Sequence, residues 1–240
     1  VRSTQGYALT EAGQAMIAYI ERMAEEADAL RRGLADGDRV PRGLVRVSMP
    51  PAVLTYCIMK SLPKLREAYP LITLDFDVRY SFSDLDRNDA DIAVRYQSKP
   101  QDHLVGVKVG NSIERAYATP AVVERHRAGE AVPLIAWARS EAFLRRAKAL
   151  GLENMPIAFS CIDVHGQMAM AEQGLGIAIL PSLVGGGSGV IQPLSPARSI
   201  ITSPIWVLTH PDLAKSIRIK TVTTFLAGVL RDALEQRGND

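Results

Sequence analysis

Two arginines, with several aromatic and hydroxyl side chains, come at the ends of predicted strands, where they could hold a small polar molecule. Arg79 and Arg95 end neighbouring strands, and a guanidinium group can hold a carboxylate through two parallel hydrogen bonds. Further candidates for the wall of the pocket, which would supply hydroxyl groups and apolar surface, are Ser81, Phe82, Tyr96 and Trp137. Either arginine could instead be solvated or paired within the chain, and Tyr96 and Trp137 could equally be packing residues.

Two loops that lead into predicted helices extend this candidate site. The first comprises Met49, Pro50, Pro51 and Ala52, and the second comprises Cys161, Ile162 and Asp163. The free N–H groups and the positive dipole end of a helix N-terminus favour anions, so we expect a small anionic or polar metabolite to bind here. The two prolines weaken the argument at the first loop because they lack N–H donors. In the second loop, Asp163 could simply cap its helix.

The sequence lacks the motifs of the common catalytic and nucleotide-binding sites. It has no G-x-S-x-G elbow, no Walker loop and no G-x-G-x-x-G after a strand. The histidines have no metal-ligand spacing and are most simply surface or packing residues: His103, His126, His165 and His210. The alternative of contact with a ligand is open only for His165, which follows the second loop. Cys57 and Cys161 could sense redox state only with depressed pKa values. We therefore predict no catalytic activity, no metal and no cofactor.

Alternating strands and helices must position these residues. Between Gly43 and Ile72 we expect a strand, a turn at Pro50-Pro51 and a helix whose apolar face carries Val53, Leu54, Ile58, Leu62 and Leu65. Further strands are expected over 72–78, 89–96, 104–109, 134–137, 157–160, 177–180 and 205–209. Further helices are expected over 120–127, 140–150, 164–173 and 214–236, with a flexible turn over 184–189. This order predicts an α/β sheet in which ligands bind beyond the carboxyl ends of the strands.

The N-terminal part predicts two short strands within residues 1–10, followed by a long helix from Glu11 to about Arg32. Apolar residues of this helix recur at alternating intervals of four and three: Met16, Ile20, Met23, Ala27, Leu30 and Leu34. Such a narrow seam is typical of helices that pair between chains, and a Gly- and Pro-containing segment separates it from the rest. We interpret it as a dimerisation helix; the alternative is an amphipathic helix folded onto its own domain.

Composition excludes several classes of protein. The 240 residues are 47% hydrophobic and 22% charged, as in ordinary globular domains. A formal charge of +2 is too small to indicate nucleic-acid binding by this chain alone. Neither a membrane-spanning run nor a signal peptide is apparent, and two distant cysteines suit a reducing cytoplasm. Because the chain begins at Val1, we expect it to be a fragment.

Short motifs along the chain resemble those of the LysR-type transcriptional regulators. Their order and spacing carry the resemblance, because each one alone is weak. Near the N-terminus they are Arg2, Gly6 and the LTEAG of residues 9–13; later come the GLVRV of 43–47, Leu62-Pro63-x-Leu65, Tyr69-Pro70, Asp91-Ile92-Ala93, the GLGIA of 174–178 and Leu180-Pro181.

The resemblance implies a DNA-binding regulator seen here as its dimerisation and effector-sensing portion. It implies about sixty further residues before Val1 that carry a winged helix-turn-helix. Residues 1–10 would be the remnant of its wing, in which Arg2 and Gln5 lie near DNA, although many members carry a basic residue where this chain has Gln5. Residues 11–42 would be the linker helix and hinge.

The implied fold is a pair of Rossmann-like subdomains of the periplasmic-binding-protein type, joined by crossing strands. Subdomain I would comprise residues 43–116 and 210–240, subdomain II residues 117–209, and the effector would bind between them. A homodimer or homotetramer in the cytoplasm is expected. The alternatives are a periplasmic solute-binding protein, which would need a signal peptide, and a two-lobed α/β enzyme, which would need a catalytic constellation.

Overall fold

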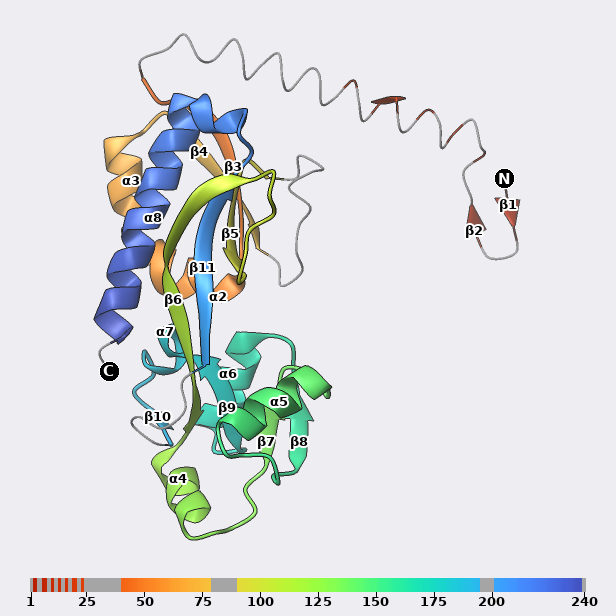
Figure 1. The fold of residues 1–240 in the computed structure, drawn as a ribbon, viewed down its shortest axis with the longest axis vertical. Coiled ribbons are helices and arrows are strands. Elements are labelled where there is room, and N and C mark those ends of the chain that lie inside the picture. The colour runs from red at the N-terminus through yellow and green to blue at the C-terminus, as the bar shows by residue number, and fades with distance from the viewer. Residues whose placement is uncertain are drawn as a thin grey trace.

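The computed structural model describes residues 2–3, 6–7, 10, 13, 16, 19–20, 23, 40–78, 90–194 and 201–238. Two lobes lie one above the other in Figure 1. Sequence and structure agree on an α/β order of elements within this part of the chain. The prediction of an α/β fold is therefore confirmed.

The upper lobe begins with β3 (Gly43–Met49), followed by a helical segment in four pieces. These pieces are α2 (Pro51–Val53), the π-helical turn η1 (Leu54–Ile58), the 3-10 turn η2 (Met59–Ser61) and α3 (Leu62–Ala68). Strands β4 (Ile72–Val78) and β5 (Ile92–Tyr96) come next. After the second lobe the chain returns through η4 (Leu213–Lys215) and α8 (Ile217–Gly238).

The lower lobe contains α4 (Pro120–Arg127), β7 (Leu134–Ala136), α5 (Glu141–Ala149), β8 (Ile157–Ser160) and α6 (Val164–Glu172). It continues with β9 (Ile177–Pro181), α7 (Ser182–Gly185) and β10 (Gln192–Pro193). Proline, capping residues and glycine mark the ends of its helices. Pro120 starts α4, Ser140 and Asp163 cap α5 and α6, and Gly174, at a φ of 72°, follows the end of α6.

Strand β6 (Val105–Ala118) runs through both lobes, and β11 (Ile201–Thr209) lies beside it from the level where the lobes meet into the upper lobe (Figure 1). In the described part of the chain the sheet order is β4-β3-β5-β11-β6-β9-β7-β8, and β10 pairs with β6. Strands β3, β4 and β5 pair in parallel, as do β7, β8 and β9, whereas the pairs made by β6 and β11 are antiparallel. Each lobe is thus a parallel sheet, and the two crossing strands join them.

Separate apolar clusters fill the two lobes. In the upper lobe, α8 packs Ile219, Val222, Leu226 and Leu230 against the sheet, and all four side chains are fully buried. In the lower lobe, Phe143 of α5 lies in a second cluster with α4 and β7. A third cluster joins the lobes, because it contains Ala52 of the upper lobe with residues of β9, α6 and α7.

Several elements differ from the sequence-based expectation; β11, for example, begins at Ile201 and not at residue 205. The expected strand over 104–109 continues to Ala118, because Gly110 and Asn111 pair with Ile205 and Pro204 of β11 instead of turning. The expected flexible turn over 184–189 begins inside a helical turn, α7. A side chain at position 185 would not fit, because Gly185 lies directly on the ring of Tyr117, where an added Cβ would come within 2.6 Å of a ring carbon.

The N-terminal segment is described only in part. Strands β1 (Arg2–Ser3) and β2 (Gly6–Tyr7) pair antiparallel, as expected. Gly13, Met16, Tyr19, Ile20 and Met23 are helical, in agreement with the expected helix. The predicted seam residues Ala27 and Leu30 lie outside the described residues, as does the predicted DNA contact Gln5.

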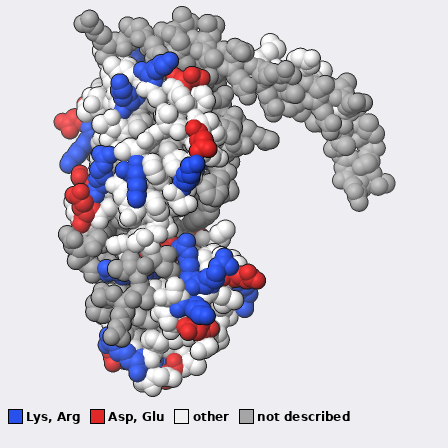
Figure 2. All heavy atoms as spheres, in the orientation of Figure 1, with Lys and Arg blue, Asp and Glu red and all other residues white. Residues whose placement is uncertain are grey.

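Charged side chains of both signs are interspersed over both lobes on the face seen in Figure 2. Among the described helices, none has the length and apolar character needed to cross a membrane.

Candidate functional site

Two loops, one from each lobe, meet where the lobes touch. The first follows β3 and starts α2 at Pro51. The second follows β8 and starts α6 at Val164, and α2 contacts α6. Both loops were predicted from the sequence, and both leave the carboxyl ends of parallel strands, which is where ligands bind in open α/β sheets.

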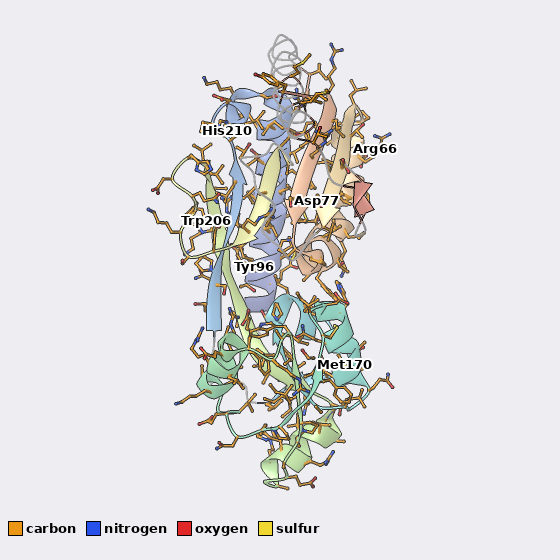
Figure 3. All side chains as sticks on the ribbon, turned by 90° about the vertical axis from the view of Figure 1, so that its right-hand side faces the viewer. Arg66, Asp77, Tyr96, Met170, Trp206 and His210 are labelled. Atoms are coloured by element: carbon orange, nitrogen blue, oxygen red, sulfur yellow. The ribbon has the colours of Figure 1, made fainter. Side chains whose placement is uncertain are left out.

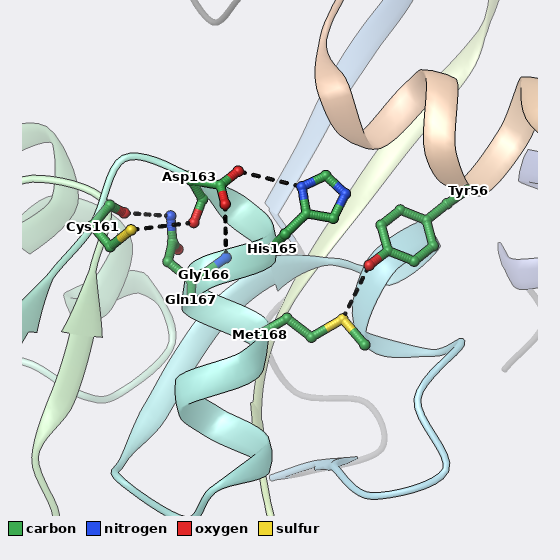
Figure 4. A network of polar contacts seen from close by, with 7 residues as sticks. All are labelled: Tyr56, Cys161, Asp163, His165, Gly166, Gln167 and Met168. Carbon is green, nitrogen blue, oxygen red and sulfur yellow. Dashed lines mark hydrogen bonds and ion pairs between the residues drawn. The ribbon is translucent and has the colours of Figure 1, made fainter.

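Hydrogen bonds within the chain fix the second loop (Figure 4). The Asp163 carboxylate accepts a hydrogen bond from the Gly166 amide at 2.9 Å and lies 3.3 Å from Nδ1 of His165. The Cys161 carbonyl accepts one from Nε2 of Gln167 at 2.9 Å. Gly166 lies close to the Cys161 side chain, since an added Cβ would lie 2.9 Å from its sulfur. The cap therefore also orients an imidazole ring at the junction.

Tyr56 reaches from the upper lobe to this loop. Its ring stacks on His165, with centroids 5.5 Å apart and planes at 17°, and its hydroxyl donates to the sulfur of Met168 at 3.3 Å (Figure 4). Sequence reasoning missed Tyr56, because a regular helix was expected where the chain forms a π-helical turn, closed by a bond from the Met59 amide to the Leu54 carbonyl. No local sequence signal marks that turn.

Arg95 is buried and hydrogen-bonded within the chain. Its guanidinium donates to the carbonyls of Ser48 and Val94 and to the hydroxyl of Ser48, at 2.9–3.0 Å. Burial lowers the pKa of Arg95, and the Asp77 carboxylate partly offsets this shift. Arg95 thus ties together the carboxyl ends of β3 and β5, and three of its hydrogen bonds serve the fold.

Tyr96 lies close to the level where the two lobes meet (Figure 3). Its hydroxyl is buried and has no hydrogen-bond partner among the described residues, and the same holds for Ser112. Burial, and next the Cys57 thiol, raises the pKa of Tyr96 well above its ordinary value; the Ser112 hydroxyl is near enough to oppose the shift, although outside hydrogen-bonding geometry. This hydroxyl does not face an open pocket.

The other predicted site residues fall into three groups. Met49 and Ala52 are buried, whereas Ile162 is 66% exposed beside the junction. Trp137 packs in the lower lobe, edge-on to Phe143 at 4.8 Å and beneath the guanidinium of Arg146. Three more lie outside the described residues: Arg79, Ser81 and Phe82.

Among the residues described, the junction shows no catalytic arrangement. Within those residues, no group of three or more His, Cys, Asp or Glu side chains is placed to hold a metal ion. Cys57 and Cys161 are free thiols. The remaining groups are hydrogen-bond partners, aromatic rings and apolar surface, which together suit recognition of a small molecule.

Comparison with known proteins identifies the family. The model of the LysR substrate binding domain matches residues 38–231. The chain belongs to this family. It is therefore the effector-binding portion of a LysR-type transcriptional regulator, a non-enzymatic family of the cytoplasm. The predicted resemblance is confirmed.

Solved LysR-type structures have the same fold. CrgA of Neisseria meningitidis matches with a TM-score of 0.71 and 20% identity, covering 96% of this chain and 83% of that chain. The effector domain of AmpR from Pseudomonas aeruginosa matches with a TM-score of 0.65 and 16% identity, over 82% and 99% of the two chains. The prediction of a periplasmic-binding-protein type of fold is confirmed by these likenesses.

Regulators of two bacteria are similar in sequence. An HTH-type transcriptional regulator of Xanthomonas campestris is 30% identical over 125 residues, which cover 52% of this chain and 36% of that protein. The regulator DmlR of Escherichia coli is 24% identical over 127 residues, covering 53% and 41%. The LysR-type chain described here thus matches less than half the length of these relatives.

Proposed function

We propose that this chain senses a small effector between its two lobes and passes that signal to DNA-reading domains of the whole regulator. The observation that carries the proposal is the junction itself. Tyr56 of the upper lobe stacks on His165 of the lower lobe, beside the capped start of α6. A molecule that enters between these loops contacts both lobes and changes the angle between them.

The proposed division of the chain follows the two crossing strands. Subdomain I comprises residues 43–116 and 210–240, and subdomain II comprises residues 117–209. Residues 1–10 belong to the DNA-binding wing, with Arg2 and Gln5 near DNA, and residues 11–42 form the linker. The separate apolar clusters support a division into two subdomains. The boundary near residue 209 falls too late, because Ile205 and Val207 of β11 lie in the cluster of the upper lobe.

The proposed effector is a small anionic or polar molecule. The start of α6 offers backbone N–H groups and the positive end of a helix dipole, although Asp163 already uses the Gly166 amide. The exposed side chain of Ile162 supplies apolar surface at the same place. Arg95 supports an anion less strongly than the sequence suggested, because its guanidinium is engaged within the fold.

The proposed assembly is a homo-oligomer paired through the linker helix. Met16, Ile20 and Met23 are helical at intervals of four and three, and their side chains are 57–71% exposed in the single chain. Apolar side chains at this spacing lie on one helix face, where a second copy would cover them. That face supports a dimer in which the lobes of each copy act on one pair of DNA-reading domains.

A thermal-shift screen of bacterial metabolites tests the sensing function. A ligand of the folded state stabilises it by about 2.7 kcal/mol at 100 times its dissociation constant. Ile162→Asp should weaken binding of any hit at least tenfold, because it introduces a charge beside the junction. Leu175→Asp is the matched control, since Leu175 is 42% exposed in the same lobe but outside the two loops.

Two results would contradict the proposal. One is a hit whose affinity is equal in wild type and Ile162→Asp, because the ligand would then bind elsewhere. The other is a validated hit that leaves small-angle scattering unchanged at saturation, because the lobes would then not move. Equal loss in both variants would point to general destabilisation and would also count against the junction.

A further inference from the structure

A cavity lies in the lower lobe, bounded by β6, β10 and α7. Its volume is about 250 Å³, and its walls include Arg115, Tyr117, Ser182, Ser188 and Gln192. It shares no residue with the two loops of the proposed effector site. We propose that this cavity binds a small organic acid, whose carboxylate pairs with Arg115, as a site separate from the one between the lobes.

The fold builds this cavity from three elements. Arg115 and Tyr117 are two residues apart in β6 and therefore share one face of the strand. Strand β10 pairs with the end of β6, with Gln192 opposite Ala118, and so forms one side wall. Helical turn α7 covers Tyr117, which is 2% exposed, and Gly185 touches its ring. Backbone pairing and a buried ring thus hold the walls in place.

Arg115 carries the only charge among the lining residues, and it has no hydrogen-bond or ion-pair partner within the described chain. Four other arginines of this lobe have carboxylate partners: Arg125 with Glu130, Arg127 with Glu124, Arg145 with Glu141, and Arg146 with Glu114. The neighbouring carboxylate in β6 is thus engaged by Arg146. Arg139 is not among these four, but it is exposed and lies outside the cavity. A half-buried guanidinium without a counter-charge favours an anion, and its planar fork fits a carboxylate with two hydrogen bonds.

Neutral donors complete the recognition chemistry. Ser182 is 6% exposed, and neither its hydroxyl nor the side-chain amide of Gln192 has a hydrogen-bond partner in the described residues. Ser188 is already engaged, because its hydroxyl donates to Glu172 at 2.7 Å and accepts from the Val190 amide. A serine hydroxyl and a carboxamide N–H₂ are donors, so the available polar groups all suit an acceptor ligand.

The size of the cavity limits the ligand. At about 30 Å³ of liquid volume per water molecule, it holds roughly eight waters. This is below the range of about 300–1,000 Å³ for drug-sized ligands, so a short carboxylic acid fits better than a nucleotide.

The walls of the cavity are connected to the upper lobe, because β6 continues into that lobe and α7 contacts α8. A bound acid would touch elements that join the lobes.

Titration with acetate, propionate and succinate at constant ionic strength tests the proposal, with thermal stability as the measurement. We expect a saturable rise in Tm with at least one acid. Arg115→Gln should weaken its dissociation constant at least tenfold. Arg139→Gln is the matched control and should bind like wild type, since Arg139 lies in the same lobe and outside the cavity.

A second measurement does not depend on a folded variant. Phenylglyoxal modifies accessible arginines, and mass spectrometry of the wild-type protein reports the rate at each one. The effective acid should slow modification of Arg115 and leave Arg139 unchanged. The proposal is overturned if no acid gives a saturable response, if Arg115→Gln binds as well as wild type, or if modification of Arg115 is not slowed.

Discussion

Tyr56 is the side chain by which the helical start of the upper lobe contacts α6. It combines ring stacking on His165 with a hydrogen bond to the sulfur of Met168. Tyr56 lies within the π-helical turn, which changes the direction of its side chain from that in a regular helix. Such turns often occur at functional sites. A ligand between the lobes would have to bind beside the Tyr56–His165 contact or displace it. Tyr56 therefore links ligand binding to the arrangement of the lobes.

Tyr96 should make the protein less stable in alkali. Its pKa is raised in the native state, first by burial, whereas an unfolded tyrosine ionises near about pH 10. Above that pH the unfolded chain releases a proton that the native state retains. The free energy of unfolding therefore falls as pH rises, with a slope of up to about 1.4 kcal/mol per pH unit from this group. Below about pH 10 its contribution is constant.

Tyr96→Phe should reduce the alkaline slope, as measured by urea unfolding between neutral and alkaline pH. At neutral pH the change should be neutral or stabilising, because a buried hydroxyl without a partner costs about 1–3 kcal/mol. The control is Tyr69→Phe, which leaves Tyr96 in place and should keep the full slope. An unchanged slope in Tyr96→Phe would show that the hydroxyl ionises freely in the native state.

Two capped helices in the lower lobe allow an effect on folding stability to be distinguished from an effect on effector binding. Ser140 caps α5 by accepting from the Phe143 amide at 3.3 Å, and Asp163 caps α6 by accepting from the Gly166 amide at 2.9 Å. Replacing either cap by alanine should cost about 0.5–2 kcal/mol of the free energy of unfolding. Denaturant titration measures this loss.

Only Asp163→Ala should also weaken effector binding, because Asp163 contacts His165 at the junction. Ser140→Ala is the matched control, since its helix packs inside the lower lobe. Calorimetric titration of the first effector from the screen would measure the difference. Equal affinities in the two variants would remove Asp163 and His165 from the proposed site.

For the whole molecule, the exposed apolar face of the N-terminal helix predicts dimerisation. Ile20→Asp should weaken self-association at least tenfold, which is about 1.4 kcal/mol of binding free energy. The dimer would then carry two carboxylates, one from each chain, in an apolar seam. Analytical ultracentrifugation measures the change. The control is Leu144→Asp, which places the same charge at a side chain that is 47% exposed on α5.

A monomeric wild-type chain in this experiment would contradict the dimerisation helix, and so would a dimer that Ile20→Asp leaves intact. In the second case the lobes themselves would be the contact surface. Strand β4 is an edge of the sheet in the described chain, so its substitution would then be the next variant to measure.

Local patterns in the sequence determined most of the elements and the family. Strand β4 and strand β8 have the expected limits, because alternation of apolar residues is a local property. The helices expected over 120–127 and 164–173 are found as α4 and α6, which begin at Pro120 and after the cap Asp163, because proline and capping effects are also local. The two candidate loops were also predictable, since they follow strands whose carboxyl ends face one edge.

Only the tertiary structure decided what the side chains around the junction contact. Tyr56 and His165 are more than a hundred residues apart, so no local pattern links them. Arg95 looked available in sequence, but buried acceptors engage it. Local sequence determines backbone preference, whereas the partner of a polar side chain depends on which distant strand the fold brings beside it.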